Sequence, residues 1–159
     1  MFFNLIKALI LFTVSSLIFL FPISVSKSFD LKIIDGDTIH LDGKKIRFNG
    51  IDAPELKQTC KKNNILNKCG KDSREILINK ILDNKPNCII EGFDKYQRSL
   101  AECFINNESL SSYLVKNGYA FAYRNYSKKF VSEEDYARIN RIGMWSMEFE
   151  FPWEFRKKN

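Results

Sequence analysis

The sequence lacks several features that mark common classes of metalloprotein and redox protein. It has a single histidine, His40, and no C-x-x-C spacing among its four cysteines. A structural zinc site or a redox-active cysteine pair is therefore not expected. His40 alternates with the apolar residues Ile39 and Leu41, so we expect it to face solvent on a strand rather than to act in catalysis. There is also no internal repeat or low-complexity linker, which leaves one compact domain as the prediction.

Long apolar runs are absent except at the start of the chain. From Ala8 to Ile23 there is no charged residue, and Lys7 precedes this stretch. The run is shorter than the ~20 residues that span a bilayer comfortably, and Ser24-Val25-Ser26 offers the small residues that a signal peptidase reads. We expect residues 1–26 to be a signal peptide, with an uncleaved membrane anchor as the alternative. Either prediction places the rest of the chain outside the cytoplasm, as a periplasmic, secreted or membrane-anchored protein.

The cysteines agree with export, because all of them follow this segment: Cys60, Cys69, Cys88 and Cys103. An even number of cysteines in a small exported domain predicts disulfides, and four cysteines allow three pairings. Cys60 and Cys69 bracket a polar loop, whereas Cys88 and Cys103 lie almost symmetrically about Lys95-Tyr96, as cross-strand partners in a hairpin would. We therefore predict the pairs 60–69 and 88–103.

Basic residues outnumber acidic ones, with 25 Lys and Arg against 19 Asp and Glu and a net charge of +6. A polyanionic partner fits this excess. Solubility alone would explain it equally well, so charge does not identify a partner.

Alternating and β-branched stretches predict two hairpins. Residues 31–41 alternate as a half-buried strand does, and Asp42-Gly43 favours a type I′ turn into a second strand from Lys44. Residues 87–91 and 100–105 flank a polar turn and predict the other hairpin.

Three helices are predicted between and after these strands. The i, i+4 spacing of Leu77 and Ile81 indicates a helix that ends by Asn84 and Pro86, and a second helix runs from about residue 109 to 118. Ser132 and Asp135 resemble a capping box that opens a third helix, which ends near residues 141–143. The order of elements predicts a small α+β domain whose sheet can close into a barrel.

Four carboxylates and one arginine fall close together on the first two predicted strands and their flanks: Asp35, Asp37, Arg47, Asp52 and Glu55. Carboxylate oxygens are hard ligands that suit Ca²⁺ or Mg²⁺. Arg47 beside such a cage could grip a phosphate through a forked pair of hydrogen bonds. From spacing alone, an ordinary solvated cluster of charge explains the same residues.

Four ordered motifs favour a functional site over a solvated cluster of charge, because together they resemble the staphylococcal nuclease (thermonuclease) family. They are Ile34-Asp35-Gly36-Asp37-Thr38, Ile46-Arg47-Phe48, Gly50-Ile51-Asp52-Ala53-Pro54-Glu55 and Asp94-Lys95-Tyr96-Gln97-Arg98. The likeness covers about residues 31–146. It is closest to a secreted bacterial branch whose tail is rich in Phe and Pro-Trp-Glu, here residues 149–154.

The resemblance implies an OB-fold β-barrel of about five strands with three helices over residues 27–146, followed by a tail, residues 147–159, that docks on it. It assigns Asp37, Asp52 and the backbone carbonyl of Ala53 as Ca²⁺ ligands. Asp35 is expected to shape the turn at Gly36.

Three further residues match the family's catalytic positions. Arg47 and Arg98 would neutralise charge growing on the phosphoryl oxygens, and Glu55 matches the proposed general base. Gln97 stands where the family usually has glycine, so the turn that presents Arg98 is expected to be strained or differently shaped.

The implied activity is that of an exported, Ca²⁺-dependent endonuclease, a phosphodiesterase that acts on DNA and RNA and leaves 3′-phosphate ends. It is expected to act as a monomer without a stable protein partner. One alternative is a catalytically inactive nucleic-acid-binding OB-fold module, although all five key positions are filled here. Another is a membrane-anchored surface protein that binds protein or lipid.

Aromatic and basic residues near the end of the chain leave more than one interpretation open. Tyr123 and Tyr126 could stack on nucleobases, with packing or a surface role as the alternative. Trp145 and Trp153 are expected to anchor hydrophobic contacts. The basic run Arg156-Lys157-Lys158 either follows a nucleic-acid backbone or is an ordinary exposed terminus.

Overall fold

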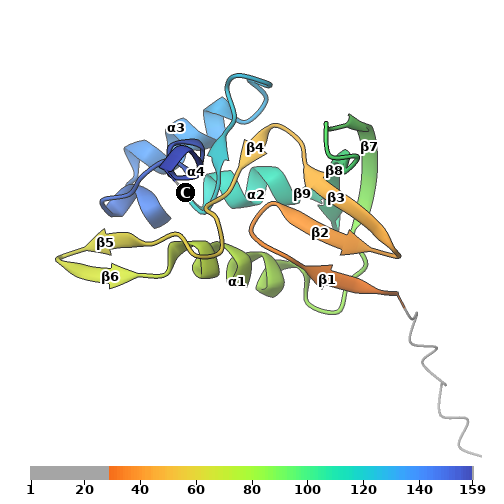
Figure 1. Ribbon diagram of the computed structural model, residues 1–159, viewed down its shortest axis with the longest axis horizontal. Helices are drawn as coiled ribbons and strands as arrows, with labels where there is room; N and C mark the ends of the chain where they lie inside the picture. Colours follow the sequence, from red (N-terminus) through yellow and green to blue (C-terminus); the bar gives the residue numbers. More distant parts are fainter. Residues whose placement is uncertain (1–28, 159) are drawn as a thin grey trace, which may run out of the picture.

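The computed structural model describes residues 29–158 (Figure 1). The predicted signal peptide, residues 1–26, lies outside the described residues. In the described part of the chain, no helix has the length and apolar character needed to cross a membrane.

A curled sheet forms the centre of the molecule, with the strand order β1-β2-β3-β8-β7 and β9 paired to β8 (Figure 1). Its strands are β1 Leu31–Ile33, β2 Thr38–Leu41, β3 Lys44–Phe48, β7 Asn87–Phe93, β8 Ser99–Ile105 and β9 Glu108–Ser109. The two predicted hairpins are both present, and the parallel pairing of β3 with β8 joins them. Two small sheets lie beside it, β4 Ile51–Asp52 with β10 Phe121–Ala122, and β5 Cys60–Lys62 with β6 Ile65–Asn67. This is the mixed α+β architecture with a partly closed OB-type sheet that was expected.

The three predicted helices are α1 Cys69–Ile81, α2 Leu110–Lys116 and α3 Val131–Ile139. A short 3₁₀ helix, Gly143–Ser146, follows, and a further helix, α4 Pro152–Lys158, forms within the tail. The described chain therefore has four α-helices rather than the three predicted. The predicted capping box is wrong, because the N-cap of α3 is Phe130 and no side chain caps the helix. Ser132 lies inside the helix, and its hydroxyl donates to Glu133 Oε2.

The stretch predicted as one strand over residues 31–41 is broken into β1 and β2, which pair with each other. The turn between them lies against α1, because a Cβ on Gly36 would stand 1.9 Å from Ser73 Oγ and 2.8 Å from the Ala53 Cβ. Only glycine allows so close an approach. The predicted β2–β3 turn is confirmed, since Asp42 and Gly43 both have positive φ, 48° and 78°.

Two hydrophobic clusters hold these elements together. The larger lies between the curled sheet, α1 and α2. The smaller surrounds Phe121 and the Cys60–Cys69 disulfide, and Trp145, Phe151 and Trp153 pack against it. The prediction that the two tryptophans anchor the chain end in apolar contacts is confirmed.

Both predicted disulfides, Cys60–Cys69 and Cys88–Cys103, are present. The second joins residues directly opposite each other on β7 and β8.

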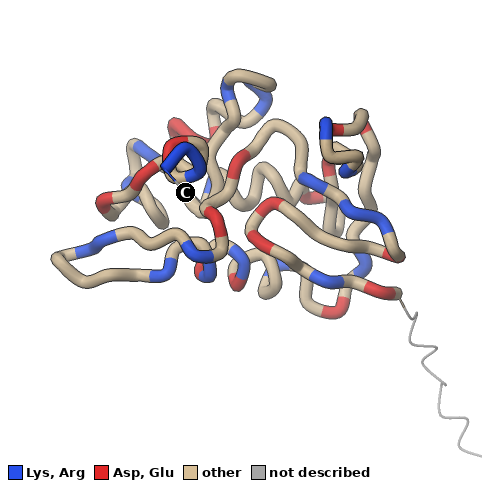
Figure 2. The backbone as a smooth tube through the Cα atoms, viewed as in Figure 1, with Lys and Arg blue, Asp and Glu red and all other residues tan. Residues whose placement is uncertain are grey.

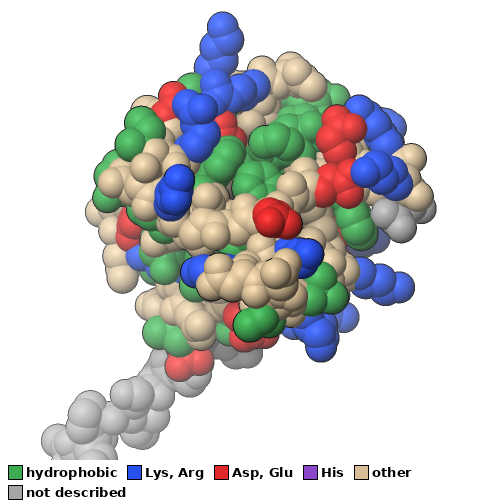
Figure 3. Space-filling view, turned by 90° about the vertical axis from the view of Figure 1, so that its left-hand side faces the viewer, with side chains coloured by type: hydrophobic (Ala, Val, Ile, Leu, Met, Phe, Trp, Pro, Cys, Tyr) green, Lys and Arg blue, Asp and Glu red, His purple; other side chains and the backbone are tan. Residues whose placement is uncertain are grey.

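Charged residues are spread over the whole molecule. Figure 2 shows Lys and Arg on all four α-helices of the described chain and on β1, β3 and β5, with acidic segments before β2, on β4 and in the loop after β4. Apolar side chains gather in the middle of the face seen in Figure 3, which looks at the molecule from the side of α3, α4 and the β5–β6 hairpin. On the face shown in Figure 3, apolar and acidic side chains thus lie among the basic ones.

Candidate active site

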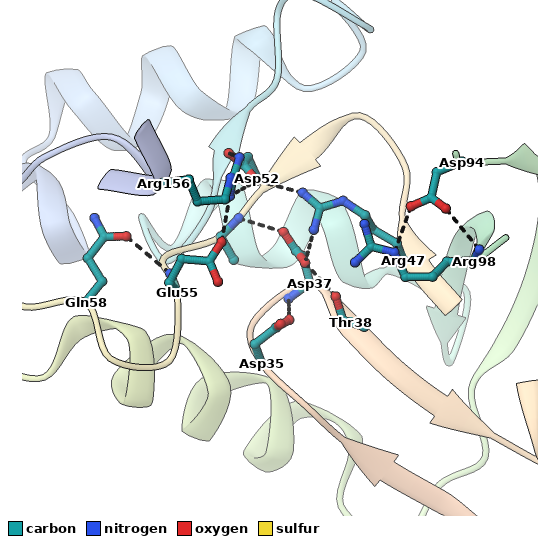
Figure 4. Close-up of polar contacts among 11 residues, drawn as sticks. Asp35, Asp37, Thr38, Arg47, Asp52, Glu55, Gln58, Asp94, Arg98 and Arg156 are labelled. Atoms are coloured by element: carbon teal, nitrogen blue, oxygen red, sulfur yellow. Dashed lines mark hydrogen bonds and ion pairs between the residues drawn. The ribbon is translucent and has the colours of Figure 1, made fainter. Parts of the chain in front are cut away.

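Two buried aspartates and an arginine form the centre of the site. Asp37 comes from the turn before β2 and Asp52 from β4, and they are 2% and 0% exposed. Arg47 on β3 lies between them and donates from Nη1 to Asp37 Oδ1 at 2.8 Å and from Nη2 to Asp52 Oδ1 at 2.6 Å (Figure 4). The sheet explains this meeting, because Arg47 lies directly opposite Thr38, the residue after Asp37. The structure thus brings together three of the predicted residues.

Both aspartates have a raised pKa, and burial is the main cause for each. The pKa of Asp37 is raised to about 6, chiefly by burial. The positive charge of Arg47 lowers it in part, and the negative charge of Asp35 raises it further. Burial also raises the pKa of Asp52, and the charge of Asp37 contributes to the rise against the hydrogen bonds from Arg156. A cation bound here would relieve the repulsion between the two aspartates.

Local hydrogen bonds fix the orientation of Asp37. Thr38 Oγ1 donates to its Oδ1 at 2.9 Å, and the Ala53 N–H donates to its Oδ2 at 2.8 Å. Asp35 shapes the turn, as expected, by accepting the Asp37 N–H at 3.0 Å. Ala53 is thus held beside Asp37 through its N–H, and the role of its carbonyl as a metal ligand stays a prediction.

Glu55 lies in the loop after β4, with its side chain 38% exposed. Gln58 holds this loop, because its side-chain oxygen accepts the Glu55 N–H at 3.2 Å and its Nε2 donates to the Glu150 carbonyl at 2.6 Å. Gly70 at the start of α1 lets the helix approach, since a Cβ there would stand 1.8 Å from the Glu55 carbonyl oxygen. A partly exposed carboxylate on a fixed loop is suited to take a proton from water.

Arg98 follows a tight turn between β7 and β8. Gln97 has a φ of 60°, so the turn does require the left-handed conformation that glycine adopts most easily. The Arg98 Nε donates to Asp94 Oδ2 at 2.7 Å, and the side chain extends from the turn toward Arg47 (Figure 4). Its guanidinium thus pairs with Asp94 rather than with the two buried aspartates.

Sequence reasoning missed a third arginine, which the structure places in the site. Arg156, on α4, donates from Nη1 to Asp52 Oδ1 at 3.1 Å and from Nη2 to Asp52 Oδ2 at 2.7 Å. Its Nη1 also donates to Glu55 Oε1 at 2.8 Å. The sequence placed this residue only in a terminal basic run. Arg156 and Asp52 are 104 positions apart, so no local pattern could have joined them.

The two candidate stacking tyrosines lie next to each other just after β10, and the Tyr123 N–H donates to the Gly50 carbonyl at 2.9 Å, next to β4. The rings of Tyr123 and Tyr126 are 4.8 Å apart, and Tyr123 also stacks on Trp153 at 5.8 Å with an interplanar angle of 14°. Tyr126 is 77% exposed. Tyr123 and Trp153 line an open pocket together with Arg124, so an aromatic surface is available there, and contact with a nucleobase stays a prediction.

The donor set fits a hard divalent cation only with help from other oxygens. Among residues 29–158, no group of three or more His, Cys, Asp or Glu side chains is arranged to hold a metal ion. Asp37 and Asp52 supply two hard carboxylates, and Ca²⁺ commonly completes its shell with backbone carbonyls and water. The buried, mutually repelling pair is therefore compatible with Ca²⁺.

Known proteins share this sequence pattern. The family model described as "Staphylococcal nuclease homologue" matches residues 45–147. Among similar proteins, the "Probable staphylococcal-like nuclease CAN2" of Oryza sativa subsp. japonica is 32% identical over 116 residues, which are 71% of this chain and 29% of that protein. The "Uncharacterized endonuclease" of Haemophilus influenzae is 30% identical over 123 residues, 73% of this chain and 64% of that protein.

A third relative carries a name from a different process. The "Succinoglycan biosynthesis protein ExoI" of Rhizobium meliloti is 31% identical over 117 residues, 71% of this chain and 61% of that protein. The chain spans less than two thirds of the length of each of these relatives. The match of the family model over residues 45–147, which contain Arg47, Asp52, Glu55 and Arg98, shows that the chain belongs to the staphylococcal nuclease homologue family.

Proposed function

We propose that this protein is an exported, Ca²⁺-dependent endonuclease that hydrolyses phosphodiester bonds of DNA and RNA and leaves 3′-phosphate ends. The observation that carries the proposal is the buried Asp37–Asp52 pair, bridged by Arg47 and flanked by the partly exposed Glu55. Two of the three relatives described above bear nuclease names, which supports the same activity. The name of the Rhizobium protein does not, so the site geometry carries more weight than the names.

Each residue has a role that follows from its position. Asp37 and Asp52 would hold the cation, with the Ala53 carbonyl as a further ligand. When bound, Ca²⁺ supplies Lewis-acid polarisation of the phosphate and a place to orient water. Arg47 and Arg98 provide guanidinium forks that suit phosphoryl oxygens, and Glu55 would accept the proton of the attacking water.

Export rests on residues 1–26 and is supported by the cysteines. The two disulfides of the described chain form most readily in an oxidising compartment, such as a periplasm or the outside of a cell. If the N-terminal segment is retained, the same domain would act at a membrane surface.

Digestion assays test activity, metal and substrate together. The purified protein is incubated with plasmid DNA or with RNA in Ca²⁺, in Mg²⁺ or with a chelator. We expect cleavage of both nucleic acids in Ca²⁺, none with the chelator, and ends that polymerise further only after phosphatase treatment. Cleavage that persists in the chelator would exclude the metal. Binding without cleavage under every condition would favour the inactive OB-fold module.

The assignment of Asp52 as a ligand has its own test. Asp52→Asn removes charge from the buried pair and should shift the Ca²⁺ dependence of cleavage to higher concentration, because an amide is a weaker ligand than a carboxylate. Asp135→Asn is the matched control, since Asp135 lies on α3 and pairs with Arg124 and Arg138. Equal Ca²⁺ dependence of the two variants would remove Asp52 from the metal site.

A further inference from the structure

The tail of the chain returns to the site and places a cation on a predicted metal ligand. Arg156 approaches Asp52 from α4, on the side opposite Arg47 (Figure 4). It makes two hydrogen bonds to Asp52 and one to Glu55, and these are the residues assigned above to bind metal and to accept a proton.

Most of the hydrogen-bonding capacity of Asp52 is thereby taken up by arginine donors. Its Oδ1 accepts from both Arg47 and Arg156, and its Oδ2 accepts from Arg156. A carboxylate has about four acceptor positions in total, so three are already used. A divalent cation at Asp52 would meet both the loss of these bonds and the repulsion of a guanidinium at contact distance.

Of the two arginines on Asp52, Arg156 is the one that can leave. Its side chain is 37% exposed, whereas that of Arg47 is 17% exposed and lies between both aspartates. Arg47 belongs to the central strand β3, but Arg156 belongs to a seven-residue helix near the chain end. Release of Arg156 therefore exposes one side chain to water without breaking the sheet.

We propose that Arg156 is a positioning residue that occupies Asp52 and Glu55 when no cation is bound, and that it competes with the divalent cation for Asp52. The proposal rests on the proposed function, because it uses Asp52 as the metal ligand. In the resting protein Arg156 keeps the two carboxylates neutralised and oriented. Cation binding requires its displacement, so α4 sets the cation concentration at which the site is loaded.

Calorimetric titration of Ca²⁺ alone into the full chain measures the competition without any cleavage. We expect Arg156→Gln to bind Ca²⁺ at least about fivefold more tightly than the wild type, which is the lower end of typical coupling free energies. Lys157→Gln is the matched control, because it removes the same charge from the same helix but pairs with Glu154. It should bind Ca²⁺ as the wild type does.

Arg156→Lys keeps the charge and loses the fork, so its Ca²⁺ affinity should fall between those of the wild type and Arg156→Gln. It also remains informative if Arg156→Gln folds poorly, which circular dichroism would show. Unchanged affinity in Arg156→Gln would overturn the competition, and weaker affinity would mean that Arg156 assists metal binding instead.

The same titrations distinguish a failure of the proposed metal site from a failure of the proposed competition. If Asp52→Asn binds Ca²⁺ as the wild type does, or if the wild type and Arg156→Gln both bind none, the metal site itself is wrong. If Asp52→Asn loses binding while Arg156→Gln matches the wild type, only the competition is wrong.

Discussion

The buried carboxylate of Asp37 accepts hydrogen bonds from Thr38, Ala53 and Arg47. These donors do not offset the loss of water and the nearby charge of Asp35, so its pKa rises to about 6. The ionised form of this aspartate is therefore a source of instability when no cation is present.

This shift predicts a pH dependence of stability in the presence of a chelator. Because the pKa of Asp37 is higher in the folded than in the unfolded chain, its contribution is greatest below its usual value of 3.8 and is lost as the pH rises through about 6. The Asp37→Asn variant does not lose stability in this way, because asparagine does not ionise. Denaturant unfolding should show the wild type losing on the order of 2 kcal/mol relative to Asp37→Asn between pH 4 and pH 7.

Asp42→Asn is a control of opposite sign, since hydrogen bonds from Lys85 and from the Asp30 N–H lower the pKa of the exposed Asp42. Its contribution is present above its usual pKa and is lost on acidification. A gap between wild type and Asp37→Asn that stays constant or widens in favour of the wild type with rising pH would contradict the account of Asp37.

At this scale the sequence could predict the residues of the local motifs but not those that fold back from elsewhere. Asp37, Arg47, Asp52 and Glu55 lie within one short segment, and their residue types and order were sufficient to group them. Arg156 reaches the site only through the packing of the tail, which no periodicity in the sequence encodes.

The turn between β7 and β8 contains a residue in an unfavourable backbone conformation. Gln97 adopts a φ of 60°, and the turn is closed by the Asp94 side chain, which accepts the N–H groups of Tyr96 and Arg98. The absence of glycine in this motif predicted a turn that is strained or differently shaped, and Gln97 does adopt the left-handed conformation, which is unfavourable for residues with a Cβ.

Gln97→Gly should therefore stabilise the protein by about 1 kcal/mol, measured as a higher midpoint of denaturant unfolding. Lys95→Gly is the matched control in the same turn. Lys95 is not among the residues with positive φ, so glycine there adds only chain entropy and should lower stability by about 0.5–1 kcal/mol. Equal effects of the two substitutions would mean that the turn is not strained at Gln97.

Elements with strong local signals were predicted well, and those fixed by tertiary contact were not. The turn at Asp42-Gly43 needs only its own two residues. The break between β1 and β2 depends on Ser73 and Ala53 approaching Gly36, and α4 depends on a docking surface, so neither could be read from local pattern.

At the scale of the whole molecule, the aromatic residues of the tail, residues 147–159, pack against Phe121 of the domain. This residue is completely buried, and its ring contacts those of Trp145, Phe149, Phe151 and Trp153. Phe121 belongs to β10, which pairs with β4, the strand that carries Asp52. Packing of the tail and geometry of the site are thus connected through one short sheet.

Phe121→Ala should destabilise the protein by about 3–5 kcal/mol, because it leaves a cavity among these rings. Phe93→Ala provides the comparison, since Phe93 is 65% exposed at the edge strand β7, and its removal should change stability by less than about 0.5 kcal/mol. Thermal or denaturant unfolding measures both, and a small effect at Phe121 would show that the aromatic cluster does not hold the tail.

The central claim is that the site built around Arg47, Asp37 and Asp52 cleaves phosphodiester bonds. The most direct measurement is the rate of plasmid DNA cleavage in Ca²⁺ by Arg47→Ala and Arg47→Lys, compared with Arg138→Ala, an exposed arginine of α3 that pairs with Asp135. We expect both Arg47 variants to lose about 100-fold or more, since each removes a fork that stabilises transition-state charge, while Arg138→Ala keeps the wild-type rate. Wild-type cleavage by a folded Arg47→Ala or Arg47→Lys protein would contradict the account.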